Sequence, residues 1–163
     1  MEQTFSLPAG LPKAERYDLF LADYLPFIEG EHDLVAALAN TSAALREAFG
    51  FFWVGFYVVK DEEWLGLGPF QGSVACTRIR RGRGVCGTAW AESRTLVVPD
   101  VDAFPGHIAC SSLSRSEIVV PLMDSQGVVR GVLDIDSDRL AAFDHDDQRG
   151  LERVVQALCQ QVY

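Results

Sequence analysis

Long apolar runs are missing from this chain, and positive charge is scarce. No apolar stretch approaches the ~18 residues of a membrane-spanning helix, and the start of the chain lacks the cationic and apolar segments of a signal peptide. Lys and Arg number 14 against 23 Asp and Glu, which gives a formal net charge of -9. Nucleic acids and anionic membranes bind cationic faces, so neither is expected as a partner. We expect a cytoplasmic protein.

Internal repeats, low-complexity tracts and interdomain linkers are absent as well. A single domain spanning residues 1–163 is therefore predicted, because domains most often have about 100–150 residues. Helical periodicity covers residues 12–30, with a bend or end near Pro26, and residues 32–50, which Asp33 can cap and Gly50 can stop. The other predicted elements are strands at 51–60, 64–70, 74–80 and 95–101, a short helix at 84–93, a hairpin at 117–136 and a final helix at 144–163. This order predicts an α+β domain, a central antiparallel sheet with the N- and C-terminal helices packed on one face.

Some charged residues fit ordinary surface roles. A cationic cluster fits a solvated hairpin or loop edge better than an anion site, and two acidic residues near the final helix fit exposed or capping positions. These residues are Arg78, Arg80, Arg81 and Arg83 in the cluster, and Asp138 and Asp144 near the helix.

The four cysteines are the most informative residues. In a reducing compartment they are core thiols, metal ligands or redox-active thiols rather than structural disulfides. Cys110 lies in a polar, tightly turned loop near His107, where access and thiolate character are plausible. Cys86 follows a Gly-rich loop at the start of the predicted short helix, where the helix dipole could lower its pKa. Cys159, in the final helix, fits a core or half-buried thiol.

A zinc site is one alternative use of these thiols. His107 and Cys110 have an H-x-x-C spacing, and Cys76 and Cys86 could add two thiolates. However, the chain contains no C-x-x-C pair, and the separation of Cys76 from Cys86 is unusual for zinc. We expect neither a metal nor another cofactor.

Besides the cysteines, three carboxylates and two aromatic residues are expected to form a second group of site residues. Strand alternation places Asp134 and Asp136 on one face, and Glu117 opens the strand that pairs with theirs. Neighbouring carboxylates repel unless a ligand cation or a shared proton compensates, so the cluster can bind an ammonium group and keep one carboxyl protonated as a donor. Trp53 and Tyr57 share a strand face and could pack on a sulfur or methyl group, although such a stripe also occurs in ordinary cores.

Three blocks of the sequence resemble one family. The segments "GPFQGSVACTRIRRGRGVCGTAW", "PDVDAFPGHIACSSLSRSEIVVPL" and "GVLDIDSD" look like the free methionine-(R)-sulfoxide reductases, enzymes made of one GAF domain. Three cysteines match those of the family: Cys76, Cys86 and Cys110. The resemblance implies an oxidoreductase for oxidative-stress repair that reduces free L-methionine-(R)-sulfoxide through a cysteine sulfenic acid and an intramolecular disulfide, with thioredoxin as the usual reductant.

The resemblance also implies roles for individual residues. Cys110 would be the nucleophile and Cys76 its resolving partner, with Cys86 as an alternative catalytic or resolving thiol. Glu117, Asp134 and Asp136 would serve as substrate-binding carboxylates and proton donor, with Trp53 as the aromatic wall against the methyl group. GAF domains often pair through their terminal helices, so a homodimer is a possible assembly.

A sensory GAF module that binds a small ligand without catalysis is the alternative function. Fold alone does not decide between the two, because function belongs to the site. The sequence continues into no effector domain after the predicted final helix, and a sensor would leave the three cysteines unexplained. Both features favour the enzyme.

Overall fold

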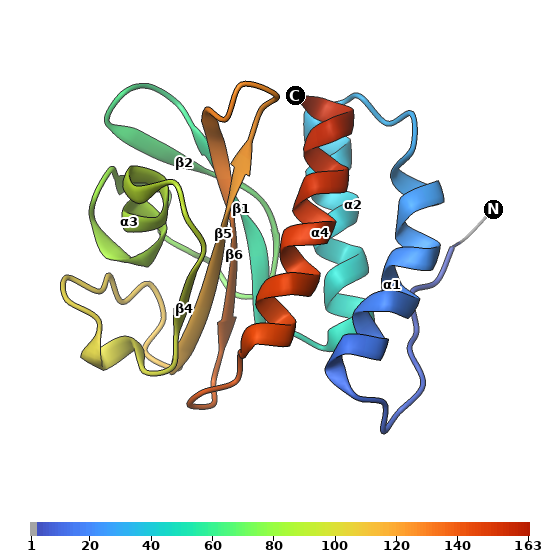
Figure 1. The fold of residues 1–163 in the computed structure, drawn as a ribbon. Helices are drawn as coiled ribbons and strands as arrows, with labels where there is room; N and C mark the ends of the chain where they lie inside the picture. The colour runs from blue at the N-terminus through green and yellow to red at the C-terminus, as the bar shows by residue number, and fades with distance from the viewer. Residues whose placement is uncertain (1–2) are drawn as a thin grey trace.

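Three helices cover one face of a sheet in the computed structural model, which describes residues 3–163; two of them lie directly against the sheet, and the first packs on their outer side (Figure 1). They are α1 (Lys13–Ile28), α2 (Leu34–Phe49) and α4 (His145–Val162). Helix α3 (Gly84–Glu92) and the long loop after strand β4 cover the opposite face. Residues 1 and 2 of the expected domain lie outside the described residues. Within the described part, no helix combines the length and apolar character needed to cross a membrane.

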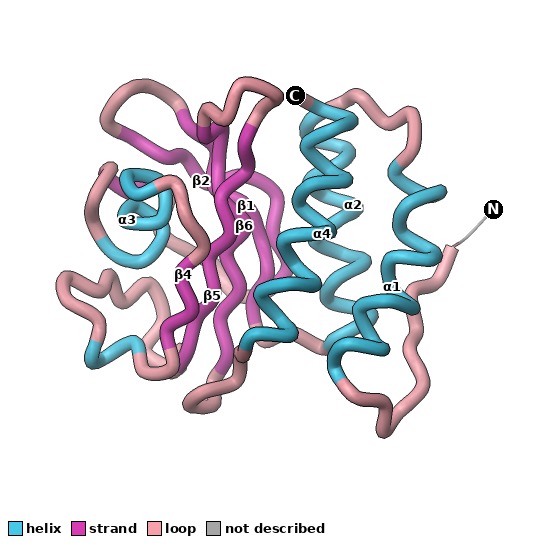
Figure 2. Tube along the Cα trace, viewed as in Figure 1, coloured by secondary structure: helices cyan, strands magenta, loops and turns pink. Residues whose placement is uncertain are grey.

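The sheet has six strands in the order β3-β2-β1-β6-β5-β4, and all its pairs are antiparallel (Figure 2). The strands are β1 (Trp53–Val59), β2 (Trp64–Gln71), β3 (Arg78–Arg80), β4 (Leu96–Val98), β5 (Ser116–Met123) and β6 (Val129–Ser137); a short 3₁₀ turn, η1 (Val101–Ala103), follows β4. The predicted α+β class and the helices on one face of the sheet are confirmed.

Alternation along the central strands divides the core into two halves. On β6, Leu133 and Ile135 pack toward α1, α2 and α4. On β1, Trp53 and Tyr57 face the other way, where they pack with α3. The second half of the core is therefore the one that can surround a site built on the sheet.

The local signals in the sequence are mostly borne out. The Asp33 side chain accepts a hydrogen bond from the N–H of Ala36, and Gly50 ends α2 in the left-handed conformation. Helix α1 runs through Pro26 to Ile28, slightly beyond the expected end, since a proline in the last turn removes only one late hydrogen bond. The strand expected at 74–80 is shorter, and the segment that carries Cys76 is an irregular loop before β3.

The arginine cluster lies on the protein surface, as expected. Arg78 and Arg80 lie over the ring of Trp64, at 5.2 and 6.0 Å from its centroid, and Arg81 lies over Trp90 at 5.0 Å. These cations cover aromatic surface at the sheet edge and on α3 while their charged groups stay in water.

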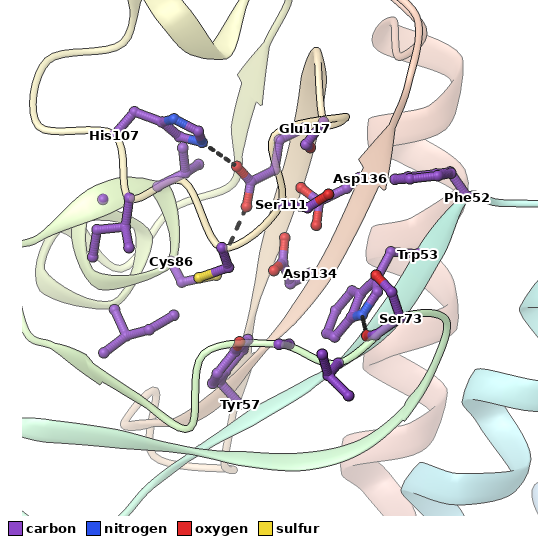
Figure 3. Close-up of a pocket in the computed structure, with 18 residues that line it drawn as sticks. Phe52, Trp53, Tyr57, Ser73, Cys86, His107, Ser111, Glu117, Asp134 and Asp136 are labelled. Atoms are coloured by element: carbon purple, nitrogen blue, oxygen red, sulfur yellow. Dashed lines mark hydrogen bonds and ion pairs between the residues drawn. The ribbon is translucent and has the colours of Figure 1, made fainter.

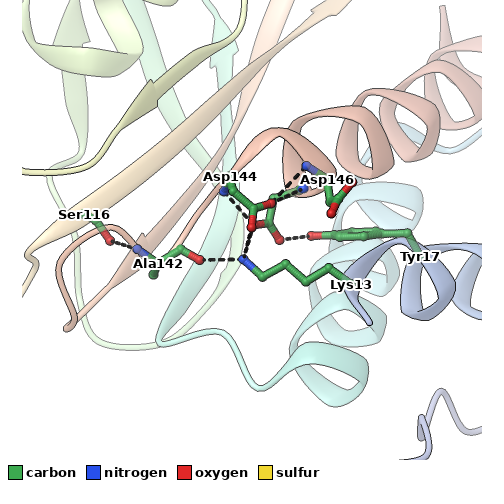
Figure 4. Close-up of polar contacts among 7 residues, drawn as sticks. Lys13, Tyr17, Ser116, Ala142, Asp144 and Asp146 are labelled. Carbon is green, nitrogen blue, oxygen red and sulfur yellow. Dashed lines mark hydrogen bonds and ion pairs between the residues drawn. The ribbon is translucent and has the colours of Figure 1, made fainter. Parts of the chain in front are cut away.

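A buried carboxylate fastens α1 to the start of α4 (Figure 4). Asp147 accepts hydrogen bonds from the Tyr17 hydroxyl at 2.8 Å and from Lys13 Nζ at 2.6 Å. Asp144 caps α4 by accepting from the N–H groups of Asp146 and Asp147, the capping role expected for it, while Asp138 is exposed. This network holds the N-terminal helix on the domain.

Candidate active site

A pocket opens on the α3 side of the sheet, and residues distant in the sequence meet in it (Figure 3). Its floor is formed by β1, β5 and β6, one side by α3, and its rim by the loops before β3 and after β4. Every residue that the sequence singled out for the reaction lines it, except Cys76, which is bonded to the lining residue Cys110. The lining residues among them are Trp53, Tyr57, Cys86, Cys110, Glu117, Asp134 and Asp136.

Strand register explains why the carboxylates converge. Residues opposite each other in antiparallel strands project to the same face. Glu117 of β5 lies opposite Asp136 of β6, and Asp136 lies opposite Trp53 of β1. These three residues form one row across the sheet, and Asp134 lies in the next row, opposite Gly55. The face expected for the two aspartates is confirmed.

Gly55 leaves room for the aromatic wall. A Cβ at this position would lie 2.8 Å from Cη2 of Trp53 and would also clash with Phe70, so only glycine lets the indole lie across the strand. The indole stacks on Phe70 at 5.3 Å between centroids and lies 6.3 Å from the Tyr57 ring. Its N–H donates to the carbonyl of Ser73 at 2.9 Å, which fixes the indole in the pocket wall.

Cys76 and Cys110 are joined by a disulfide with a Cα–Cα distance of 5.5 Å. Cys110 is exposed on the rim and Cys76 is half-buried. The Tyr57 hydroxyl donates to the carbonyl of Cys76 at 2.9 Å, which anchors this side of the bridge on the sheet. The two thiols that the resemblance paired are therefore within bonding distance at the mouth of the pocket.

The loop that carries Cys110 leaves the sheet and returns to nearly the same point. The N–H of Val101 donates to the carbonyl of Arg115 at 2.9 Å, and the N–H of Arg115 donates to the carbonyl of Ser137 at 2.7 Å. Between these ties, Ile108 packs over Gly84, whose φ of +64° favours glycine and brings the start of α3 close to the loop. The loop thus forms a cover over the pocket.

Cys86 lies at the inner end of the pocket and is 3% exposed. Its Sγ lies 3.9 Å from Oε1 of Glu117, to which the thiol donates. Burial, followed by the nearby charges of Asp134 and Glu117, raises the pKa of Cys86 well above its usual value. The expectation that the helix dipole would lower the pKa of this thiol is therefore wrong, because burial beside carboxylates outweighs the partial charge of a short helix.

The three carboxylates differ from surface groups in their protonation. Burial, then repulsion from Asp134 and Asp136, raises the pKa of Glu117 well above its usual range. Burial raises the pKa of Asp134 and, together with repulsion from Asp134, that of Asp136. Glu117 and Asp134 are each 6% exposed, and Oδ1 of Asp134 has no hydrogen-bond partner in the described protein. The cluster can hold a proton for donation and has an acceptor free for a ligand.

His107 lies closer to the chemistry than the sequence indicated. Its Nε2 is 3.9 Å from Oε2 of Glu117, so it is the basic side chain nearest the carboxylates in the described structure. The sequence places it near Cys110, but its contact with Glu117 depends on the path of the loop. The pocket is also lined by Phe52, Ile108 and Ser114. No sequence signal indicated these three residues, except that they lie near Trp53 or Cys110.

The alternative zinc set of His107, Cys76, Cys86 and Cys110 would require free thiolates, and the disulfide occupies two of its three cysteines. A different group of potential ligands is brought together by the fold: one atom each from Cys86, Glu117 and Asp134, all within 4.8 Å of one another. Cys159 lies apart from the pocket, in the other half of the core, and burial raises its pKa to about 11. Its expected role as a core thiol fits this position.

Known proteins share this architecture over most of the chain. Residues 33–162 match the family model of the GAF domain. The GAF domain-containing protein A of Dictyostelium discoideum is 57% identical over 146 residues, which cover 90% of this chain and 92% of that protein. The free methionine-R-sulfoxide reductase of Escherichia coli is 46% identical over 147 residues, covering 90% and 88% of the two chains.

The fold and the site thus define a member of the GAF domain family. Among solved structures, the free methionine-R-sulfoxide reductase from Neisseria meningitidis in complex with its substrate has a TM-score of 0.92 and 52% identity, covering 99% of this chain and 95% of that one. Within the GAF proteins, this chain belongs to the free methionine-R-sulfoxide reductase family. The family resemblance seen in the three sequence blocks is confirmed.

Proposed function

We propose that this protein reduces free L-methionine-(R)-sulfoxide to L-methionine. The observation that carries the proposal is the meeting of a Cys76–Cys110 disulfide with a buried carboxylate cluster in one pocket. The disulfide is the product expected of two thiols that have reduced a sulfoxide, and the carboxylates supply a proton and an ammonium site. Relatives that cover most of the chain carry this activity in their names.

The reaction uses two thiols and one sulfoxide oxygen. In the reduced enzyme, the thiolate of Cys110 attacks the sulfoxide sulfur while the oxygen takes up a proton. The protonated oxygen then passes from the substrate sulfur to the sulfur of Cys110. The substrate S–O bond breaks, an S–O bond to Cys110 forms as a sulfenic acid, and methionine leaves. Cys76 attacks the sulfenic sulfur, which releases water and forms the disulfide. The thiols lose two electrons in total and the sulfoxide gains them.

The carboxylates are given separate tasks in this scheme. Glu117 is held protonated by burial and by its neighbours, so it is the proposed proton donor to the sulfoxide oxygen. Asp134 has an unpartnered oxygen, and together with Asp136 it is the proposed site for the substrate ammonium. Trp53 and Tyr57 are the proposed wall against the S-methyl group. Cys86 is kept as an alternative thiol whose raised pKa favours a role after the first attack.

We further propose that thioredoxin restores the reduced enzyme in the cytoplasm, where such systems keep thiols reduced. The exposed position of Cys110 supports this, because a protein reductant must reach one sulfur of the bridge. We also propose that residues 1–163 form a single catalytic domain and that two such domains pair as a homodimer.

The decisive experiment is an assay of methionine formation from free methionine sulfoxide. The purified protein is supplied either with thioredoxin, its reductase and NADPH or with dithiothreitol, and methionine is measured by chromatography. Multiple turnovers per chain are expected with both reductants. A protein that binds the sulfoxide but forms no methionine would instead be a sensory GAF module.

A further inference from the structure

We infer that Cys86, Glu117 and Asp134 form a binding site for one thiophilic divalent cation, such as Zn²⁺, and that this ion competes with substrate for the pocket. One donor atom from each residue lies within 4.8 Å of the other two. They come from three different elements, α3, β5 and β6, so the fold assembles the site (Figure 3). The competition, but not the binding of the ion, rests on the function proposed above.

The spacing of the donors is close to that of a tetrahedral zinc centre. Zinc–sulfur bonds of about 2.3 Å and zinc–oxygen bonds of about 2.0–2.2 Å place neighbouring donors roughly 3.4–3.6 Å apart. The Sγ of Cys86 is already 3.9 Å from Oε1 of Glu117. Small rotations of the side chains therefore complete the geometry, and three protein ligands leave the fourth position for water, as in open zinc sites.

Electrostatics favours a cation at this position. The carboxylates of Glu117, Asp134 and Asp136 point into the same space, as Figure 3 shows. Among the described lining residues there is no Lys or Arg, so His107 is the single side chain there that can carry positive charge. A divalent ion would compensate the mutual repulsion of groups that otherwise remain protonated.

An unpartnered oxygen points to a ligand independently of the cluster. Asp134 is only 6% exposed, and its Oδ1 accepts no hydrogen bond within the described protein. Water outside the pocket therefore does not satisfy this oxygen. Leaving a buried carboxylate oxygen without a partner is costly. The internal space of the pocket is about 50 Å³, which holds a few water molecules or a partly hydrated ion.

Competition with substrate follows from the shared groups. Asp134 and Glu117 are the residues proposed to hold the substrate ammonium and to donate the proton. An ion bound to both would block the two functions together. The oxidised enzyme can also bind the ion, because Cys86 is a free thiol while Cys76 and Cys110 are bonded to each other.

Cadmium titration of the oxidised protein tests the site directly, because a cadmium–thiolate bond gives an ultraviolet charge-transfer band. Cys86 and Cys159 are the free thiols in this form. One equivalent of Cd²⁺ per chain is expected to give the band in the wild type and in Cys159→Ser, and no band in Cys86→Ser. Asp134→Asn is expected to weaken binding at least about tenfold, whereas Asp138→Asn, on the exposed carboxylate past β6, should leave it unchanged.

A second measurement needs no substitution and so does not depend on how the variants fold. X-ray absorption of the zinc-loaded wild type is expected to show one sulfur at about 2.3 Å and oxygen or nitrogen at about 2.0–2.2 Å. A zinc shell without sulfur, a band that survives in Cys86→Ser, or no stoichiometric binding would each overturn the site.

The competition is measured in a variant that cannot turn over, Cys76→Ser combined with Cys110→Ser, which keeps Cys86 free. Saturating free methionine-(R)-sulfoxide should lower its apparent affinity for Cd²⁺ at least tenfold, and the (S) epimer should not. Unchanged affinity would overturn the competition and leave the metal site standing. Cadmium binding in a protein without reductase activity would refute the proposed function alone.

Discussion

Replacing Glu117 with glutamine separates proton donation from the structure of the pocket. The amide keeps the shape of the side chain and can donate a hydrogen bond to the free oxygen of Asp134, but it has no proton to transfer. General acid catalysis by a positioned side chain contributes typically about 10²–10⁴-fold. We expect Glu117→Gln to lower kcat for free methionine-(R)-sulfoxide by that factor, measured as methionine formation with dithiothreitol so that reductant docking does not limit the rate.

The same substitution should raise stability at neutral pH. The folded pKa of Glu117 is raised, whereas the unfolded value is about 4.3. Between these values the folded state holds a proton that the unfolded state has lost, so the wild type loses stability as pH rises through this window. The loss is up to about 1.4 kcal/mol per pH unit. Glutamine does not titrate, so the stability advantage of the variant should grow by that amount across the window.

Urea unfolding at several pH values measures this difference, and Asp138→Asn is the matched control because Asp138 is exposed and outside the carboxylate cluster. The control should have the activity and the pH dependence of the wild type. Activity of Glu117→Gln within tenfold of the wild type would refute the assignment of the proton donor. A variant that is less stable than the wild type at neutral pH would refute the electrostatic argument.

Five further outcomes are expected. Cys110→Ser should form no methionine in a single turnover, while Cys76→Ser should form about one equivalent and then stall with thioredoxin; a burst lost only in Cys86→Ser would reassign the nucleophile. N-acetylation removes the ammonium, which should reduce kcat/KM about 30- to several-thousand-fold, since a buried charge without its partner costs roughly 2–5 kcal/mol; equal turnover of the acetylated sulfoxide contradicts the ammonium site. Chiral chromatography of a racemic mixture should show the (R) epimer consumed and the (S) epimer left. Gly55→Ala should destabilise the fold by about 1–3 kcal/mol in a urea melt through overpacking against Phe70 and the indole. Asp147→Ala should destabilise it by about 1–3 kcal/mol, because the buried Tyr17 hydroxyl loses its hydrogen-bond acceptor; wild-type midpoints would contradict these two arguments.

The sequence by itself determined the elements and the chemical inventory. Apolar periodicity, the Asp33 cap and the Gly50 stop give α2 directly, because these signals act within a few residues. Alternation in "GVLDIDS" assigned Asp134 and Asp136 to one face, since the period of a strand is fixed by its backbone. The pairing of Cys76 with Cys110 came from the family resemblance.

Tertiary structure decided the surroundings of these groups, and hence their protonation. Helix position alone suggested a lowered pKa for Cys86, but the registers of β5 and β6 bring Glu117 and Asp134 beside it and reverse the shift. The contact between His107 and Glu117 depends on where a long loop returns to the sheet. The pKa of a buried group depends on how many atoms cover it and on which charges lie near it. Residues distant in the sequence contribute both, so no local sequence pattern could predict the direction of these pKa shifts.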